Sequence, residues 1–144
     1  MNLAKIQKEL KAPKSNLNKF GNYKYRSAED ILEAVKPLLE GSTITLTDEM
    51  VQVGERYYVK ATATLTSEDK SFSTSAYARE AETKKGMDDA QITGSASSYA
   101  RKYALNGLFA IADNDDPDST NKHEVEKPKE VSNESIITRD DSAF

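Results

Sequence analysis

The sequence of 144 residues contains no cysteine, no tryptophan and a single histidine, His123. The absence of cysteine excludes disulfides, thiolate zinc sites and cysteine nucleophiles, and a lone histidine excludes histidine-rich metal sites and most Ser-His catalysis. Apolar runs are short, and none approaches the ~20 residues that a helix needs to cross a bilayer. The first residues also lack the apolar core of a signal peptide. These absences predict a small cytosolic protein with few catalytic options.

Hydrophobic residues are scarce as well, at 37% of the chain, while charged residues reach 31%. Ordinary globular chains are roughly 45–50% apolar, so part of this chain is expected not to pack. The net charge of −4 conceals an asymmetry. Residues 1–26 hold seven basic side chains and one acidic one, whereas residues 113–144 hold four basic and ten acidic ones. The basic segment favours a polyanionic partner, although lysines that are merely solvated would give the same pattern.

The acidic segment, residues 113–144, has few large apolar side chains and many Asp, Glu, Ser, Lys and Pro. It cannot bury enough surface to offset the entropy of ordering, so we predict a folded domain over residues 1–112 and a disordered acidic tail over 113–144. The run Asp113–Asp118 lacks the glycine and terminal glutamate of an EF-hand loop. A two-metal nuclease would need carboxylates on a rigid scaffold, so we predict neither a metal site nor another cofactor.

Two helices are predicted near the start of the chain. Apolar residues at helical spacing indicate a helix over residues 2–12, followed by a polar loop over residues 14–26. Ser27 is a good N-cap for a second helix that reaches about residue 40, because its side chain can accept a hydrogen bond from the amide of Asp30. Pro37 lies inside this second helix and predicts a kink or an early stop.

From residue 43 to about residue 80 the hydrophobic period changes from 3.6 to 2, which predicts a three-stranded antiparallel meander. Gly54 marks the first hairpin. A two-residue turn of Gly54 and Glu55 would place Val51 and Val53 on the polar face of the next strand. We therefore predict a three-residue turn with a left-handed Gly54, which places both valines on the apolar face.

A last helix is predicted from about Ala90 to Gly107, capped by Asp88 or Asp89. Its small residues 94–98 permit close approach to a neighbouring element. The face expected to lie on the sheet comprises Ile92, Ala96, Tyr99/Ala100 and Tyr103. The predicted fold class is α+β, with a three-stranded antiparallel meander, flanking helices and the disordered acidic tail.

Cations alternate with aromatic rings in the polar loop, at Lys19, Phe20, Tyr23, Lys24, Tyr25 and Arg26. Single-stranded nucleic acid needs this combination, because cations contact phosphates and flat rings stack on bases. The alternative is that the three aromatic residues anchor the loop to the core.

Two further groups are candidates for the same role. Arg101 and Lys102 are expected to point away from the buried stripe of the last helix, where they could contact phosphates, although a solvated basic turn is the alternative. The other group shares the outer face of the predicted sheet and could converge there if no helix covers it: Tyr58, Lys60, Tyr77 and Arg79.

These segments carry a family resemblance. FGNYKYRS at residues 20–27 leads into DIL at 30–32 and PLL at 37–39, and GSASSYARKYAL follows at 94–105, before Asp113 and Asp115-Asp116. Together the motifs resemble the ERF (essential recombination function) family of phage single-strand DNA annealing proteins, over about residues 1–116. The pattern GSA-x-x-YAR-x-YAL is the most specific element.

The resemblance implies a protein that is not an enzyme, coats single-stranded DNA and anneals complementary strands without ATP in phage homologous recombination. It also implies a β-β-β-α core, a homo-oligomeric ring or filament, the cytoplasm of a host bacterium, and DNA in a basic groove. We expect the DNA-binding residues to be Lys19, Phe20, Tyr23, Lys24, Tyr25, Arg26, Lys60, Arg79, Arg101 and Lys102. A passive single-strand binder is the alternative, and a metal-dependent nuclease that uses Asp113–Asp118 is a third hypothesis.

The last residues suggest a partner-binding tip. Asp140, Asp141 and Phe144 resemble the acidic, Phe-ending tip of bacterial single-stranded-DNA-binding proteins, although the usual proline before the final Phe is missing. Such a tip could dock a host or phage single-stranded-DNA-binding protein, an exonuclease or a replication or repair protein. The other predicted role is electrostatic, since the acidic tail would compete with DNA for the basic residues 1–26.

Overall fold

The computed structural model describes residues 3–112. The predicted disordered tail, with Asp113–Asp118, Asp140, Asp141 and Phe144, lies outside the described residues. Between residues 3 and 112 no helix has both the length and the apolar character required to cross a membrane. The described chain divides into two compact units, a larger one of residues 3–13 and 26–112 and a hairpin of residues 14–25.

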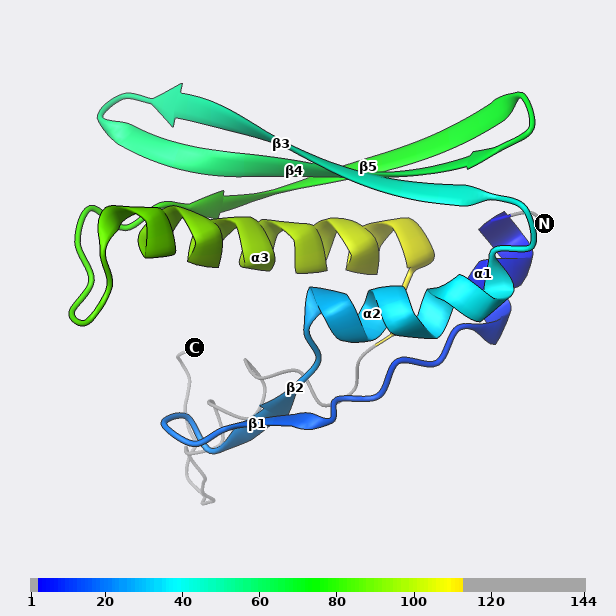
Figure 1. The fold of residues 1–144 in the computed structure, drawn as a ribbon, viewed down its shortest axis with the longest axis horizontal. Helices are drawn as coiled ribbons and strands as arrows, with labels where there is room; N and C mark the ends of the chain where they lie inside the picture. The colour runs from blue at the N-terminus through cyan, green and yellow to red at the C-terminus, as the bar shows by residue number, and fades with distance from the viewer. Residues whose placement is uncertain (1–2, 113–144) are drawn as a thin grey trace, which may run out of the picture. The chain divides into compact units, whose positions relative to one another are not determined.

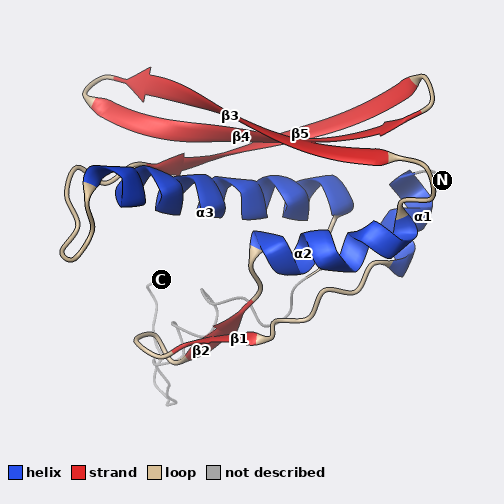
Figure 2. Cartoon of the chain, in the orientation of Figure 1, coloured by secondary structure: helices blue, strands red, loops and turns tan. Residues whose placement is uncertain are grey.

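The larger unit has an antiparallel sheet with strands in the order β3-β4-β5. Its elements are α1 (Leu3–Glu9), α2 (Ala28–Val35), the short 3-10 helix η1 (Lys36–Leu38), β3 (Thr43–Val53), β4 (Arg56–Ser67), β5 (Lys70–Arg79) and α3 (Asp89–Phe109). Helix α3 lies along one face of the sheet, and α2 lies on the side of α3 away from the sheet (Figures 1 and 2). The α+β class and the order of three strands followed by a helix are confirmed.

Two predictions about the second helix are confirmed, the N-cap at Ser27 and the early stop at Pro37. The amide of Asp30 donates to Ser27 Oγ at 3.1 Å, and the amide of Ser27 donates to Asp30 Oδ2 at 2.9 Å, so the two residues form a capping box. The regular helix ends at Val35, and Pro37 lies in the η1 turn that follows. Helix α1 is shorter than predicted and ends at Glu9.

The predicted turn of the first hairpin is wrong. Val53 pairs with Arg56, so Gly54 and Glu55 form a two-residue turn, and Val51 and Val53 lie on the outer face of the sheet. Gly54 does adopt the predicted left-handed conformation, with φ at 63°. A tight two-residue turn matches the twist of the flanking strands, and this outweighs the exposure of Val53, which is 58% exposed.

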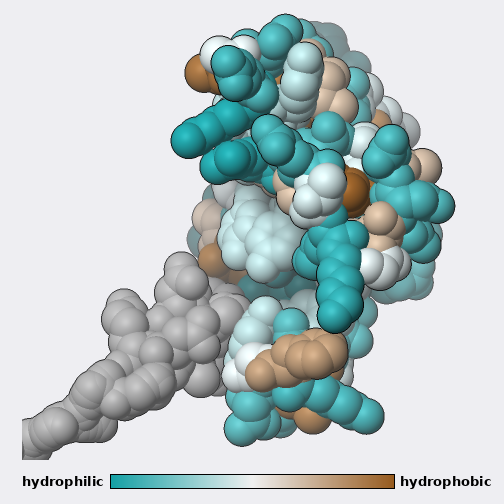
Figure 3. Space-filling view, turned by 90° about the vertical axis from the view of Figure 1, so that its left-hand side faces the viewer, coloured by the Kyte–Doolittle hydropathy of each residue, from teal (hydrophilic) through white to brown (hydrophobic). Residues whose placement is uncertain are grey.

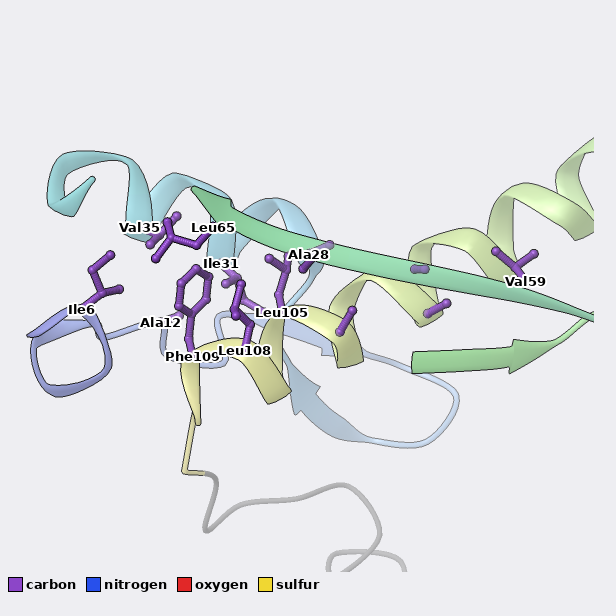
Figure 4. Close-up of a cluster of buried hydrophobic side chains, with 14 of the residues drawn as sticks. Ile6, Ala12, Ala28, Ile31, Val35, Val59, Leu65, Leu105, Leu108 and Phe109 are labelled. Atoms are coloured by element: carbon purple, nitrogen blue, oxygen red, sulfur yellow. The ribbon is translucent and has the colours of Figure 1, made fainter. Parts of the chain in front are cut away.

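The core forms where α3 packs on the sheet and on α2 (Figure 4). Buried residues of α3 recur every four positions at Ile92, Ala96, Ala100 and Ala104, and Leu105, Leu108 and Phe109 are buried in its last turns. On the sheet side, Ala61 and Ala63 of β4 are fully buried in the same cluster. Small side chains on both surfaces bring the helix close to the sheet.

The predicted buried face of α3 needs a correction, because Tyr99 and Tyr103 are 51% and 45% exposed. The close helix–sheet contact leaves no room for a tyrosine ring, so the buried stripe follows the alanines instead. The predicted packing role of residues 94–98 holds for Ala96, whereas Gly94 faces open space. The close approach is required at Gly107, where a Cβ would lie 2.8 Å from Thr74 Cγ2.

The hairpin unit corrects a further prediction. Residues 14–26 were expected to form a loop, yet β1 (Asn16–Asn18) and β2 (Tyr23–Tyr25) form a two-stranded antiparallel sheet. The turn between them is closed by its own side chains, as described below.

Candidate nucleic-acid interface

The turn of the hairpin is held by the side chain of Asn18. Its Oδ1 accepts hydrogen bonds from the amides of Phe20, at 2.9 Å, and Gly21, at 3.1 Å. Its Nδ2 donates to the hydroxyl of Tyr23 at 3.0 Å. One short side chain therefore satisfies two turn amides and ties the turn to the second strand, which is the usual role of Asn in such turns.

The predicted aromatic residues of the hairpin divide into two groups. Tyr23 and Tyr25 are half-buried, and their rings meet edge to face with centroids 6.4 Å apart. Phe20 is fully exposed at the tip of the turn. Lys19 and Lys24 of the same hairpin are exposed as well, and residues 14–25 contain no acidic side chain. The hairpin thus presents one fully exposed ring and two exposed cations.

Arg26, the last residue of the predicted cluster, is buried in the larger unit. Its Nε donates to the carbonyl of Ala12 at 2.5 Å. The guanidinium therefore joins the segment after α1 to the start of α2, and we leave it out of the candidate interface.

The sequence did not show whether a helix covers the outer face of the sheet. Helix α3 occupies the opposite face, and no helix of the described chain covers the outer one (Figure 1). Lys60 pairs across the strands with Tyr77, and Tyr58 pairs with Arg79. The Lys60 ammonium lies 5.9 Å from the centroid of the Tyr77 ring, within cation–π range. These four side chains converge as predicted.

Hydroxyl groups occupy the rest of β4 and β5 on this face. Facing pairs are hydrogen-bonded at 2.7 Å, 2.8 Å and 3.2 Å, for Thr62–Ser75, Thr64–Ser73 and Thr66–Ser71. On the outer face of these two strands, cations and aromatic rings are therefore confined to the end of the sheet that carries Tyr58 and Arg79.

On α3, Tyr99 and Tyr103 form an exposed pair with a cation beside it. The two ring centroids are 5.6 Å apart, and the Lys102 ammonium lies 4.8 Å and 5.0 Å from them. Sequence reasoning singled out Lys102 but assigned these two rings to the core. The signal that could have found them is the alanine repeat at positions 96, 100 and 104, which defines a different buried face.

The tyrosine pair borders a cleft between α3 and β5. The cleft has a volume of about 350 Å³, and its lining includes Tyr99, Tyr103, Tyr77, Arg79 and Lys84. It therefore joins the aromatic surface of α3 to the cationic end of the sheet. Figure 3 shows this end of the molecule, where hydrophilic side chains, in teal, predominate over small hydrophobic areas, in brown. We call these five residues with Lys102 the cleft surface.

Arg101 lies apart from Lys102, against β3. Its Nε donates to Asp48 Oδ1 at 3.0 Å, and Ser97 Oγ donates to Asp48 Oδ2 at 2.6 Å. Burial acts to raise the pKa of Asp48, but the hydrogen bond from Ser97 and the hydrogen bond and charge of Arg101 outweigh it and hold that pKa below its ordinary value. The predicted pair of cations is thus divided between two flanks of the helix.

The fold and these surfaces define a small α+β protein in which exposed aromatic rings are accompanied by cations, on the hairpin, the outer sheet face and the cleft. The sequence profile of the ERF superfamily matches residues 1–139, and the chain belongs to that superfamily. The Essential recombination function protein of Salmonella phage P22 is 61% identical over 125 residues, which cover 87% of this chain and 60% of that protein. The chain thus spans about 60% of the length of this curated relative. No solved structure is significantly similar to the chain.

Proposed function

We propose that the chain binds single-stranded DNA and anneals complementary strands during phage homologous recombination, with no nucleotide cofactor. Membership of the ERF superfamily and the name of the phage P22 relative support the role in recombination. The observation that carries the binding is the cleft surface, where Lys102 lies within 5.0 Å of the centroids of two exposed tyrosine rings. Aromatic faces beside cations accept unpaired bases and phosphates together, with little preference for sequence.

The small size of this surface supports the further proposal that the chain assembles into a homo-oligomer. One chain offers a short track, and a ring or filament would join several tracks so that weak contacts add up to useful affinity. The working site would be the cytoplasm of the host bacterium, and other recombination or repair proteins there would be the partners. We keep a passive single-strand binder as the alternative, because stacking and charge support binding without requiring that strands be paired.

The test is the annealing of two complementary fluorescent oligonucleotides, in EDTA and without ATP. We expect faster annealing with the protein. Replacing both Tyr99 and Tyr103 with Ala should weaken single-strand binding about 100-fold, since each lost stack costs roughly 1–3 kcal/mol. Tyr57→Ala is the matched control, because this tyrosine is 46% exposed but does not line the cleft.

Each alternative gives a different result. Tight binding without faster annealing would make the protein a passive binder. Loss of strands in Mg²⁺ that EDTA prevents would indicate a nuclease. An absence of single-strand binding would overturn the proposal.

A further inference from the structure

The tip of the hairpin exposes a side chain that proteins normally bury. Phe20 has an exposed fraction of 104%, the largest among the exposed large hydrophobic residues of the described chain. Phenylalanine is among the residues found most often in protein interiors, and a turn needs no apolar side chain at its tip. This ring is therefore available to an external ligand.

The ring is presented by a turn that is fixed in advance. Asn18 holds the amides of Phe20 and Gly21, and Asn22 adopts a left-handed conformation with φ at 54°. A Cβ at position 21 would overlap the ring of Tyr23, so glycine is required there. Because the turn is preorganised, little conformational entropy is lost when Phe20 enters a binding partner.

The charges around the tip define the partner. Lys19, which precedes Phe20, and Lys24 of β2 are both exposed, and no acidic residue occurs from residue 14 to residue 25. An anionic polymer with flat apolar faces satisfies both features at once, and unpaired nucleic acid is such a polymer. A protein partner would need an apolar pocket with an acidic rim.

We propose that Phe20 inserts between two neighbouring bases of a bound single strand and separates them, while Lys19 and Lys24 contact the flanking phosphates. Apolar side chains at exposed tips unstack bases in this way in other nucleic-acid complexes. This inference rests on the proposed function, and it adds that the hairpin spreads the bases of the strand. Stacked duplex DNA resists such insertion, so the hairpin would favour unpaired strands.

The natural sequence allows a clean optical test, because it contains no tryptophan. Phe20→Trp keeps an aromatic ring and places the only indole of this 144-residue chain at the tip. We expect single-stranded oligo(dT) to quench its fluorescence by stacking, and duplex DNA to quench it much less. Phe72→Trp is the matched control, since Phe72 is also an exposed phenylalanine but lies on β5, outside the hairpin. Equal quenching of both variants would overturn the insertion.

A second experiment measures the bases directly. An oligonucleotide with 2-aminopurine brightens when its neighbours unstack, and the native protein should produce this increase. Phe20→Ala should abolish the increase and weaken binding roughly 10-fold, because one base–aromatic contact is lost. An unchanged increase with Phe20→Ala would overturn the proposal.

The two proposals fail in different ways. Binding seen by fluorescence anisotropy without quenching of the tip indole would reject the insertion and leave the proposed function intact. An absence of binding in the same titration would reject the proposed function itself. A change in indole emission that follows protein concentration without DNA would identify a second copy of the chain as the partner and overturn the inference.

Discussion

The hairpin and the cleft surface combine the same kinds of side chain but are built in different ways. In the hairpin, contacts between near neighbours hold the ring in place, since Asn18 bonds to residues two, three and five positions away. In the cleft, Tyr99 of α3 and Arg79 of β5 come together only because the helix packs on the sheet. The turn of the hairpin can therefore keep its shape when the core is disturbed, whereas the cleft depends on the packing of the whole larger unit.

The largest effect should come from disturbing that packing. Ala100 is fully buried between α3 and the sheet, so Ala100→Leu inserts three carbon atoms where none fit. Overpacking of this kind costs about 1–3 kcal/mol, and the displaced helix should also open the cleft and weaken single-strand binding. Urea unfolding and an oligonucleotide titration measure the two effects.

The matched control for this substitution is Ser98→Leu, on an exposed position of the same helix. It should change stability by less than about 0.5 kcal/mol. In the Ala100→Leu variant, quenching of an indole at position 20 should persist in proportion to the strand that is bound. Loss of that signal at saturating DNA would show that the hairpin depends on the core after all.

The hairpin can be disturbed by itself through Asn18→Ala. This change removes the acceptor of two turn amides and the donor to Tyr23. Since these groups reach water readily, we expect global stability to change by less than about 1 kcal/mol. Binding should weaken by roughly 3-fold to 10-fold, because the ring of Phe20 is no longer preorganised. A fall in stability as large as that of Ala100→Leu would show that the hairpin turn is not stabilised independently of the core.

The same distinction explains which features the sequence could predict. The Ser27 cap, the stop at Pro37 and the period-2 strands depend on neighbours in the chain, and each is confirmed. The burial of Tyr99 and Tyr103 was predicted wrongly because it depends on how closely two surfaces approach, and that distance is set by alanines on both of them. Nothing in the local sequence of residues 99–103 carries this information.

The division of Arg101 from Lys102 was beyond sequence reasoning for the same reason. The two residues are adjacent in the chain, and only the register of β3 places Asp48 beside Arg101. The aromatic cluster of residues 19–26 is the intermediate case. Its sequence indicated a cationic, aromatic segment, but whether each ring was free or packed depended on the turn, and Phe20 alone is fully exposed.

The smallest expected effect concerns Asp48, which tests whether Arg101 belongs to the binding surface. Asp48→Asn keeps the shape of the side chain and removes the charge that neutralises Arg101. If Arg101 contacts phosphates, its restored charge should tighten single-strand binding by about 2-fold to 5-fold at low salt, which corresponds to an exposed ion pair. Glu33→Gln is the control, because Glu33 forms an exposed ion pair with Lys36 at 3.2 Å, outside the proposed binding surfaces. Weaker binding in Asp48→Asn would instead show that the carboxylate positions the guanidinium.

The pH dependence of stability also tests the ion pair of Asp48 and Arg101. The pKa of Asp48 is lowered in the folded chain, so the ionised carboxylate stabilises the fold at pH values above its ordinary pKa. This contribution is lost as the pH falls below about 4, through the ordinary pKa of aspartate and then through the lower folded value. The stability difference between the native chain and Asp48→Asn should therefore be constant at neutral pH and shrink in acid. A difference that stays constant down to pH 2 would mean that the ion pair with Arg101 contributes nothing to the fold, and the carboxylate of Asp48 would then not hold Arg101 away from a strand.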